Sequence, residues 1–443
     1  MDNSIIQGFS KYNKEQRIDA LINKYGFDSS LGTFLKSCEV TDESVQKIID
    51  DLSENPISSF PFPFSVAPNF VVNGKNLFFP LVSEESSVVA ALGNAAGFWA
   101  KRGGFHAEVL GTEKKGQVHF KWGGNAEQLQ LLFLEIREKL LTDCAPLTEK
   151  MEERGGGITG LELKVLPNIL PNYYQLDASF ETCDAMGANF INSCLEQMGK
   201  SLQNYFRESK AISDCDRECE IIMAILSNYT PESHVKVWVE CPVSNLLDGN
   251  TEAECEAFAR RFEQAVRISQ LDVSRAVTNN KGIFNGIDAL AVATGNDFRA
   301  IEACGHAFAS RNGQYSGLTD LQIQDGKFRF SIGLALAVGV IGGVTAVHPM
   351  AKLAMKILDN PSAKELMMYL AVAGLASNFA AVKALVSVGI QKGHMKMHLS
   401  NIMNQLQIPE EKRAEIQDYF RDKTVSFSAV EEYWKSSGLR DSG

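Results

Sequence analysis

The sequence around Lys281 suggests a chemical role for this residue. It lies in the segment NNKGIFNGIDALAVATGND, between an asparagine and a glycine. If the lysine is partly desolvated where this segment runs into an apolar helix, it can act as a fixed cation for a developing oxyanion. The alternative is a solvated loop lysine, which is the commoner case for any single lysine. Asp297 closes the same segment, and its ordinary role there is to cap the helix predicted by DFRAIEACGHAF.

Three further side chains are candidates for proton transfer. Glu84 and Glu85 precede an alanine-rich helical pattern, where acidic residues ordinarily complement the helix dipole. Either glutamate needs burial or a neighbouring carboxylate to raise its pKa toward neutrality before it can serve as a general acid. His394 follows Gly393 near the C-terminus. A histidine can donate a proton to a leaving group near neutral pH, although an isolated one is as often a surface residue.

The segment DAMGAN, residues 184–189, lies between an alternating strand pattern and an amphipathic helix pattern. Small residues let a ligand approach the backbone, and a helix start offers free N–H groups and a positive dipole end to a pyrophosphate. A tight strand-to-helix turn with a capping aspartate explains the same residues. Spacing alone favours this simpler interpretation.

Several common site motifs are absent from the sequence. It contains no G-x-G-x-x-G, Walker A, G-x-S-x-G or H-E-x-x-H pattern. His394 and His398 have the spacing of a helical zinc pair, but position 395 is methionine, so the metalloprotease base is missing. Cys215 and Cys219 lack a second pair to complete a zinc site. The sequence therefore predicts no metal.

The elements that must position these residues begin with a strand–helix–strand–strand–helix–strand order over residues 112–228. Alternating apolar residues predict strands at Gln117–Trp122, Leu161–Val165 and Tyr174–Phe180, and an apolar run predicts another strand at Glu220–Asn228. Helical stripes cover Glu127–Leu141 and residues 191–206. The order predicts a ferredoxin-like module inserted in a larger domain.

The flanking segments predict the larger domain. Residues 1–50 are polar and helical in pattern, and a proline-broken extended stretch, PISSFPFPFSVAPNF, follows them. His234–Cys241 alternates as a strand, and Thr251-x-x-Glu254 is a capping box before a long helix. The uncharged stretches Phe330–Val347 and Leu366–Val382 are short for membrane spans, so buried core is the favoured interpretation.

Composition excludes some partners. The chain has 443 residues and a net charge of −11, and without basic clusters it is a poor candidate for nucleic-acid binding. Its nine dispersed cysteines are typical of reduced cytosolic thiols. The N-terminus lacks the apolar core of a signal peptide. These features predict a cytoplasmic protein that binds neither nucleic acid nor membrane.

Taken together, these segments resemble the class II, bacterial-type hydroxymethylglutaryl-coenzyme A reductases. The likeness runs from about residue 50 to residue 400, and the two ends match more weakly. The matching pieces occur in the family's order and at its spacing. They are PLVSEESSVVAA (Pro80–Ala91), GGG (Gly155–Gly157), DAMGANFIN (Asp184–Asn192), ILSN (Ile225–Asn228), NKGIFNGID (Asn280–Asp288), ATGNDFRAIEA (Ala293–Ala303), VGVIGG (Val338–Gly343), AVHP (Ala346–Pro349), GLASN (Gly374–Asn378) and GIQKGHMKMH (Gly389–His398).

The resemblance implies roles for the candidate residues. Lys281 holds the oxyanion of the thioester carbonyl, and Glu85 exchanges a proton when the aldehyde is reduced. Asp297 tunes both of these groups, and His394 protonates the departing thiolate. Substrate binding is implied for Ser87, Arg275, Asn285 and Asn378, the last as a support for Lys281. Cofactor binding is implied for Asp184, Met186, Gly187, Ala188, Asn189, Asn228 and Thr148.

The resemblance also implies a fold and a reaction. The fold is α+β, with a large mixed substrate domain (residues 51–111 and 229–388), an inserted ferredoxin-like dinucleotide-binding domain (112–228) and a C-terminal helical flap (389–443) after the N-terminal helical segment (1–50). The site is completed across a homodimer interface. The implied reaction is reduction of hydroxymethylglutaryl-CoA to mevalonate and CoA by two hydrides from NADPH or NADH.

Two questions stay open at the level of sequence. Thr148 stands where family members that use NADH carry an acidic residue, which would repel a 2′-phosphate. Thr148 beside Lys150 therefore favours NADPH, and Glu149 argues the other way. The same enzyme could also run oxidatively in mevalonate catabolism. A non-catalytic CoA- or nucleotide-binding protein is a further alternative, which the joint presence of the four catalytic residues argues against.

Overall fold

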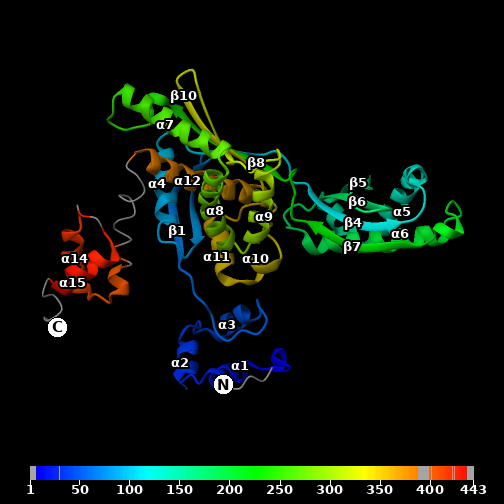
Figure 1. Cartoon of the computed structure of the whole chain (residues 1–443), viewed down its shortest axis with the longest axis horizontal. Coiled ribbons are helices and arrows are strands. Elements are labelled where there is room, and N and C mark those ends of the chain that lie inside the picture. Colours follow the sequence, from blue (N-terminus) through cyan, green and yellow to red (C-terminus); the bar gives the residue numbers. More distant parts are fainter. Residues whose placement is uncertain are drawn as a thin grey trace.

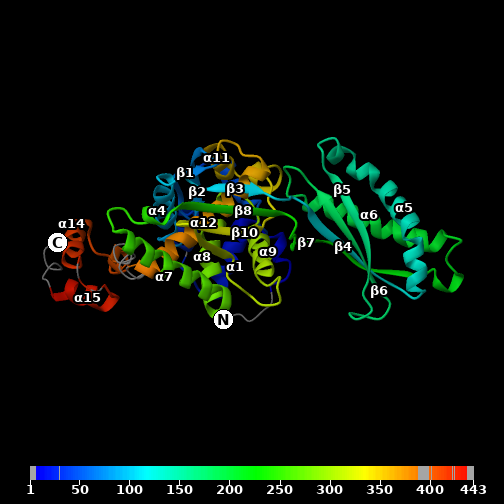
Figure 2. The same cartoon turned by 90° about the horizontal axis from the view of Figure 1, so that it is seen from above.

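The chain folds into separate hydrophobic cores. The computed structural model describes residues 6–28, 30–387, 399–400, 402–421, 423 and 425–436. One large cluster of buried residues draws on segments 67–109 and 235–382, a second on 118–219 and a third on 399–434. The first cluster lies in the central body of the molecule, and the second lies in a smaller unit, called the small unit below. In Figures 1 and 2, the central body has the small unit at one end and the C-terminal helices at the other. The mixed α+β class that the sequence predicts is confirmed.

The N-terminal segment forms short polar helices, as predicted. They are α1 (Lys14–Tyr25), α2 (Ser30–Ser37) and α3 (Glu43–Asp50), after a short 3-10 turn at Phe9–Lys11. A capping box starts α1, in which the side chains of Asn13 and Gln16 each accept the other residue's backbone N–H. The ammonium of Lys14 lies 2.8 Å from the carboxylate of Asp50 and ties α1 to α3. Figure 1 shows these helices below the central body.

The central body opens with an antiparallel hairpin, β1 (Phe64–Val72) and β2 (Lys75–Val82), followed by α4 (Val88–Ala100). The predicted extended stretch PISSFPFPFSVAPNF runs into strand β1, which begins at Phe64. The strand pairing shifts between Ala67 and Phe70, around Pro68. Such an irregularity lets a strand accept a proline that cannot donate a ladder hydrogen bond.

A second antiparallel sheet lies beside the hairpin. Its strands follow the order β3 (His106–Val109), β8 (His234–Pro242), β10 (Lys327–Ala335) and β9 (Thr319–Gln324). Along β8, Val235, Val237 and Val239 are fully buried, which confirms the predicted alternation. Short 3-10 turns at Asp214–Asp216 and Val243–Asn245 precede β7 and follow β8.

Helices build the rest of the body. They are α7 (Glu252–Leu271), α8 (Val273–Ala293), α9 (Phe298–Ala309), α10 (Gly343–Val347), α11 (Pro349–Ile357) and α12 (Ala363–Ser387). The predicted capping box at Thr251 and Glu254 is present at the start of α7. The uncharged stretch Leu366–Val382 lies in α12, most of which is buried in the core, although the helix is long and apolar enough to cross a membrane.

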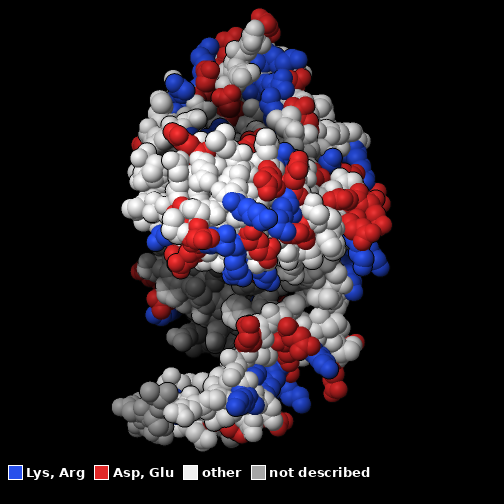
Figure 3. Space-filling view, turned by 90° about the vertical axis from the view of Figure 1, so that its right-hand side faces the viewer, with Lys and Arg blue, Asp and Glu red and all other residues white. Residues whose placement is uncertain are grey.

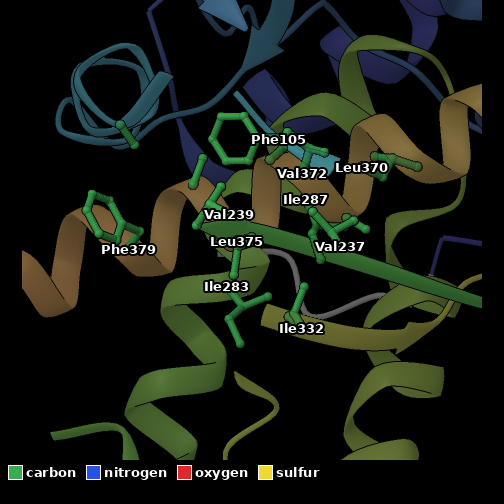
Figure 4. Packing of buried hydrophobic residues seen from close by; sticks show 14 of the residues in the cluster. Phe105, Val237, Val239, Ile283, Ile287, Ile332, Leu370, Val372, Leu375 and Phe379 are labelled. Carbon is green, nitrogen blue, oxygen red and sulfur yellow. The ribbon is translucent and has the colours of Figure 1, made fainter. Parts of the chain in front are cut away.

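Helices α8 and α12 approach each other very closely. A Cβ atom on Gly286 of α8 would lie 2.4 Å from the carbonyl oxygen of Ala373 on α12. A Cβ on Gly374 would lie 2.9 Å from Ile283 and Ile287. Figure 4 shows Ile283 and Ile287 of α8 packed with Leu375 and Val372 of α12 against the strands. The glycines therefore let the two helices pack backbone to backbone.

The small unit has the predicted ferredoxin-like order. Its elements are β4 (Lys114–Trp122), α5 (Ala126–Glu152), β5 (Gly157–Val165), β6 (Tyr173–Glu181), α6 (Ala188–Glu208) and β7 (Cys219–Ser227). The antiparallel strands follow the order β5-β6-β4-β7, and α5 and α6 pack together on the sheet (Figure 2). Helix α5 runs past the predicted end at residue 141 and through Pro146, because Leu140, Cys144 and Thr148 continue its buried face.

The C-terminal helices α14 (Glu410–Tyr419) and α15 (Phe427–Ser436) share a small core of their own. Met403 and Ile416 are fully buried there, together with Val430. Residues 388–398 lie outside the described residues, and they include Gly389, Gly393 and His394.

We predict that Gly286→Ala destabilises the central body by roughly 1–3 kcal/mol, because the backbone of α12 must move to admit the new methyl group. Chemical denaturation measures the loss. The matched control is Gly97→Ala in α4, where a Cβ would meet nothing within 4 Å. That substitution should be neutral or stabilising by up to about 1 kcal/mol, as helix propensity dictates. Equal unfolding free energies for the two variants would contradict the close-packing argument.

Candidate active site and cofactor site

Lys281 and Glu85 meet although they lie 196 residues apart in the sequence. Lys281 is in the middle of α8 rather than in a loop, and its Nζ lies 2.9 Å from Oε2 of Glu85. Glu85 occupies the turn between β2 and α4. Its backbone N–H donates to Ser83 Oγ at 3.1 Å, and Ser87 donates its hydroxyl to Glu85 Oε1 at 3.2 Å. The turn thus presents the carboxylate to the lysine.

This ion pair is exposed within a single chain. The side chain of Lys281 is 63% exposed and that of Glu85 is 41% exposed. The expectation of a partly desolvated lysine at a loop–helix junction is therefore wrong for one chain, because Lys281 lies within α8 and its side chain is largely exposed to solvent. In water such a pair is only weakly stabilising. Strong stabilisation of an oxyanion at Lys281 requires that a ligand or a further protein surface cover it.

Asp297 caps helix α9, as its simpler interpretation predicts. Its Oδ1 accepts the backbone N–H groups of Arg299 and Ala300 at 3.1 and 3.2 Å, and it pairs with the guanidinium of Arg299 at 3.3 Å. Within the described part of the chain, Asp297 and Lys281 share no ion pair. The structure thus brings two of the four predicted catalytic residues together, has no ion pair between Asp297 and Lys281 among the described residues, and does not describe His394.

The predicted substrate-binding residues divide into surface and buried positions. Asn285 follows Lys281 by one turn on the same side of α8. Burial lowers the pKa of the Arg275 guanidinium, which has no carboxylate within 4.0 Å among the described residues. Asn378 is only 1% exposed, and its amide donates to the carbonyl of Asn279 at 3.1 Å. Asn378 therefore holds α8 from behind rather than lining the exposed side.

The predicted cofactor turn joins β6 to α6. Gly187 precedes α6 with φ +89°, and a Cβ there would lie 2.5 Å from Thr182. Both the positive φ and the close approach of Thr182 require glycine at position 187. No side chain caps the start of this long helix, so the N–H groups that begin at Ala188 and Asn189 remain for a ligand. Such a helix start is suited to a pyrophosphate.

The same turn is attached to the central body. The carboxylate of Asp184 accepts the backbone N–H of Ala363 at 2.8 Å, where α12 begins. The carbonyl of Asp184 accepts the N–H of Val340 at 2.8 Å, and Ala185 bridges to Ile341. Asp184 thus has a structural role within the chain, in addition to any contact with a ligand.

A narrow cavity lies where the turn meets the central body. Met186, Ala188 and Asn228 line it from the small unit, and Ala300 and Ala337 line it from the body. Three of the residues predicted to bind cofactor therefore share one cavity. Its wall also includes Lys114, which motif analysis did not single out. The period of two was a usable signal, since Lys114 has the parity of the inward-facing Val118.

Thr148 does not reach a binding surface in this structure. It is 2% exposed within α5, and its hydroxyl donates to the carbonyl of Ala145 at 3.3 Å. Helix α5 continues through this position, which the sequence left outside the helix, and the contact of Thr148 with the cofactor stays a prediction.

A carboxylate pair lies near the ion pair. Asp288 follows Lys281 by two turns of α8, and burial raises its pKa to about 8, with further increases from Glu302 on α9 and from Glu84. One carboxyl oxygen of Asp288, Oδ1, is buried and has no hydrogen-bond partner among the described residues. Asp288 therefore holds its proton at neutral pH.

The arrangement offers acid–base and electrostatic groups rather than a metal centre. Within the ranges that the structure describes, no group of three or more His, Cys, Asp or Glu side chains could hold a metal ion. Lys281 supplies positive charge, Glu85 an adjacent carboxylate, and the start of α6 an anion site. Together these groups are suited to charge development on a substrate oxygen beside a bound dinucleotide.

Comparisons with known proteins give one consistent answer. The family model described as hydroxymethylglutaryl-coenzyme A reductase matches residues 15–399. The chain is 33% identical over 404 residues to the 3-hydroxy-3-methylglutaryl-coenzyme A reductase of Archaeoglobus fulgidus, covering 90% of this chain and 86% of that protein. It is 35% identical over 377 residues to a probable reductase of the same name from Borreliella burgdorferi, covering 85% and 82%.

Solved structures agree with these relatives. The class II 3-hydroxy-3-methylglutaryl-CoA reductase from Streptococcus pneumoniae, bound to NADPH in open conformations, superimposes with a TM-score of 0.71 at 33% identity, covering 86% of this chain and 99% of that one. The fold, the site and the comparisons define an oxidoreductase that acts on a coenzyme A thioester. The chain belongs to the hydroxymethylglutaryl-coenzyme A reductase family, and its reaction is the reduction of hydroxymethylglutaryl-CoA.

The raised pKa of Asp288 predicts how stability depends on pH. The folded chain keeps a proton that the unfolded chain releases above the ordinary carboxyl pKa of 3.8. The free energy of unfolding should therefore fall as pH rises from 3.8 toward about 8. Asp288→Asn stays neutral and should flatten this fall, as denaturation at about pH 5 and about pH 8 will measure. The control Asp325→Asn, in the β9–β10 turn, should keep the wild-type dependence of unfolding free energy on pH. The same dependence in Asp288→Asn would contradict the prediction.

Proposed function

We propose that this chain converts hydroxymethylglutaryl-CoA to mevalonate and CoA by two successive hydride transfers at the Lys281–Glu85 pair. The observation that carries the proposal is the contact of 2.9 Å between these side chains, which unites two segments of a chain belonging to this family. NAD(P)H supplies the hydride at each step. The protein residues supply charge, protons and position.

Lys281 acts first, at the thioester carbonyl. As hydride reaches the carbonyl carbon, negative charge builds on oxygen, and the ammonium of Lys281 stabilises it. The resulting hemithioacetal expels the CoA thiolate, which His394 protonates. In the second reduction Glu85 delivers the proton that the new alkoxide needs, with Lys281 as its close partner. Asp297 adjusts the proton affinity of both residues once the site is complete.

Substrate recognition is assigned to residues around the ion pair. Arg275 lacks a carboxylate partner among the described residues, so its guanidinium can take the substrate carboxylate in a paired hydrogen bond. Ser87 and Asn285 lie beside Glu85 and Lys281, respectively, and contact the hydroxymethylglutaryl part. Asn378 supports α8 beneath the lysine.

The dinucleotide is assigned to the turn at residues 184–189, with its pyrophosphate at the start of α6. The uncapped helix start and the cavity shared by Met186, Ala188 and Asn228 support this placement. We propose NADPH as the preferred cofactor, supported by the NADPH bound in the pneumococcal relative. In this plan residues 112–228 form the cofactor domain, and residues 51–111 with 229–388 form the substrate domain.

A homodimer completes the site in this proposal. The exposure of Lys281 in one chain leaves room for a second copy to cover it. Val273 and Val277 on α8 are also exposed, which suits an apolar contact there. Residues 389–443, with His394, then act as a flap over the substrate. A cytoplasmic location remains a prediction from the sequence.

The direct test of function is stoichiometry. Purified protein with hydroxymethylglutaryl-CoA should oxidise two NAD(P)H for each CoA released, because a thioester needs two hydrides to become an alcohol. Absorbance follows the cofactor and a thiol reagent follows CoA. Release of CoA without cofactor oxidation would indicate a hydrolase, and no release of CoA at all would indicate a binding protein.

Replacing the lysine tests its role. Lys281→Ala should fold and bind cofactor, because the side chain is exposed, and it should lose about a hundredfold to a thousandfold in turnover. The matched control is Lys327→Ala, which removes a similarly exposed lysine, 3.4 Å from Glu240, on β10. Turnover should survive that change. Normal thioester reduction by Lys281→Ala would rule out the oxyanion role.

A further inference from the structure

Lys114 has an unusual position for a lysine. It begins β4, whose inward-facing residues Val118, Phe120 and Trp122 are fully buried and apolar. Lys114 lies on the same face and is only 4% exposed. Burying a charge costs free energy that an apolar side chain at this position would not cost. The stability of the fold therefore gives no reason for a lysine here.

The contacts of Lys114 leave its charge uncompensated. Its Nζ donates to Thr182 Oγ1 at 2.6 Å and, more weakly, to the carbonyl of Ala185 at 3.4 Å. Thr182 in turn donates its hydroxyl to the same carbonyl at 2.7 Å. Both acceptors are neutral, and no carboxylate of the described chain lies within 4.0 Å of the amine. Burial lowers the pKa of Lys114, while Glu181 and Cys183 raise it less.

The nearest acidic group is already engaged. The carboxylate of Glu181 accepts the hydroxyl of Thr112 and the backbone N–H of Cys183. Surface lysines of the small unit are placed differently. Lys115, next in sequence and on the opposite face of β4, pairs with Glu113 at 3.0 Å. On the face seen in Figure 3, from the small-unit end, blue and red side chains are interspersed.

The uncompensated charge lies beside the turn proposed to bind the dinucleotide. Lys114 lines the narrow cavity together with Met186, Ala188 and Asn228. Its two hydrogen-bond acceptors, Thr182 and Ala185, flank the start of that turn. An anion bound at the start of α6 would thus be attracted both by the helix dipole and by the buried ammonium of Lys114.

We propose that Lys114 is a further cofactor-binding residue, whose buried ammonium pairs with the pyrophosphate of the dinucleotide at the start of α6. This inference rests on the proposed placement of the cofactor. It adds a residue that supplies charge to a turn made of small, neutral side chains. The bound pyrophosphate supplies the anionic partner that Lys114 lacks within 4.0 Å among the described residues.

The test is cofactor binding without turnover. Fluorescence titration with NADH and with NADPH should show that Lys114→Met binds both about tenfold to a hundredfold more weakly, as loss of a charge-assisted hydrogen bond predicts. The control Lys115→Met, one residue away on the opposite face, should bind both as the wild type does. Thermal unfolding checks that both variants are folded.

Two outcomes would overturn the proposal. Wild-type affinity of Lys114→Met for both cofactors would remove Lys114 from the site. A loss confined to NADPH would move its contact to the 2′-phosphate, which NADH lacks. Failure of the proposed function can be told apart from failure of this inference. A protein that binds cofactor through Lys114 but has no turnover would contradict the proposed function and support the inference.

A second measurement keeps the proposal testable if Lys114→Met does not fold. The affinity of the wild-type protein for NADPH should fall at a pH below the ordinary lysine pKa of 10.5, because burial lowers the pKa of the Lys114 amine. Cys183 also acts on the pKa of Lys114, so Cys183→Ser must show the same dependence. An affinity that stays constant up to the ordinary lysine pKa would contradict the pairing.

Discussion

The contact between Lys281 and Glu85 is the interaction on which the site depends, and helix packing makes it possible. Glu85 lies in a turn fixed by its own serine neighbours, whereas Lys281 is carried by α8. Gly286 of α8 and Gly374 of α12 let the two helices approach to backbone contact. Asn378 adds hydrogen bonds to the helix just before Lys281. The position of one surface amine is thus set by a buried interface.

A short segment of the central body, residues 339–341, contacts both the start of α9 near Asp297 and the turn at residues 184–189. The N–H of Gly339 donates to the side chain of Asn296, next to Asp297. The N–H of Val340 donates to the carbonyl of Asp184, in the turn assigned to the cofactor. Hydride transfer requires donor and acceptor to be held within close limits. Direct hydrogen bonds between the two sides meet that requirement better than a flexible linker would.

Lys281 and Lys114 differ in their exposure to solvent. Lys281 is exposed and paired with a carboxylate, so its field in one chain is weakened by water. Lys114 is buried and has only neutral hydrogen-bond acceptors, so its charge is costly and its pKa is lowered. In the proposed mechanism, the field of Lys281 gains strength when substrate covers the ion pair.

The sequence by itself determined the elements whose patterns are local. The period of two in β8, the capping box of α7 and the order of the small unit all survive folding, because side-chain alternation and helix capping depend on near neighbours. The resemblance in ordered motifs also pointed to Lys281 and Glu85. It could not show that the two touch, since 196 residues separate them.

Only the tertiary structure decided burial. It placed Lys281 on the exposed side of α8, Thr148 inside α5 and Lys114 in the wall of the cavity beside the turn at residues 184–189. It also gave Asp184 a hydrogen bond to the start of α12. The exposure of a side chain depends on which distant segments pack over it, and that information is not contained in local spacing. Residue types therefore suggested the chemistry, and long-range packing decided which groups are dry, charged and in contact.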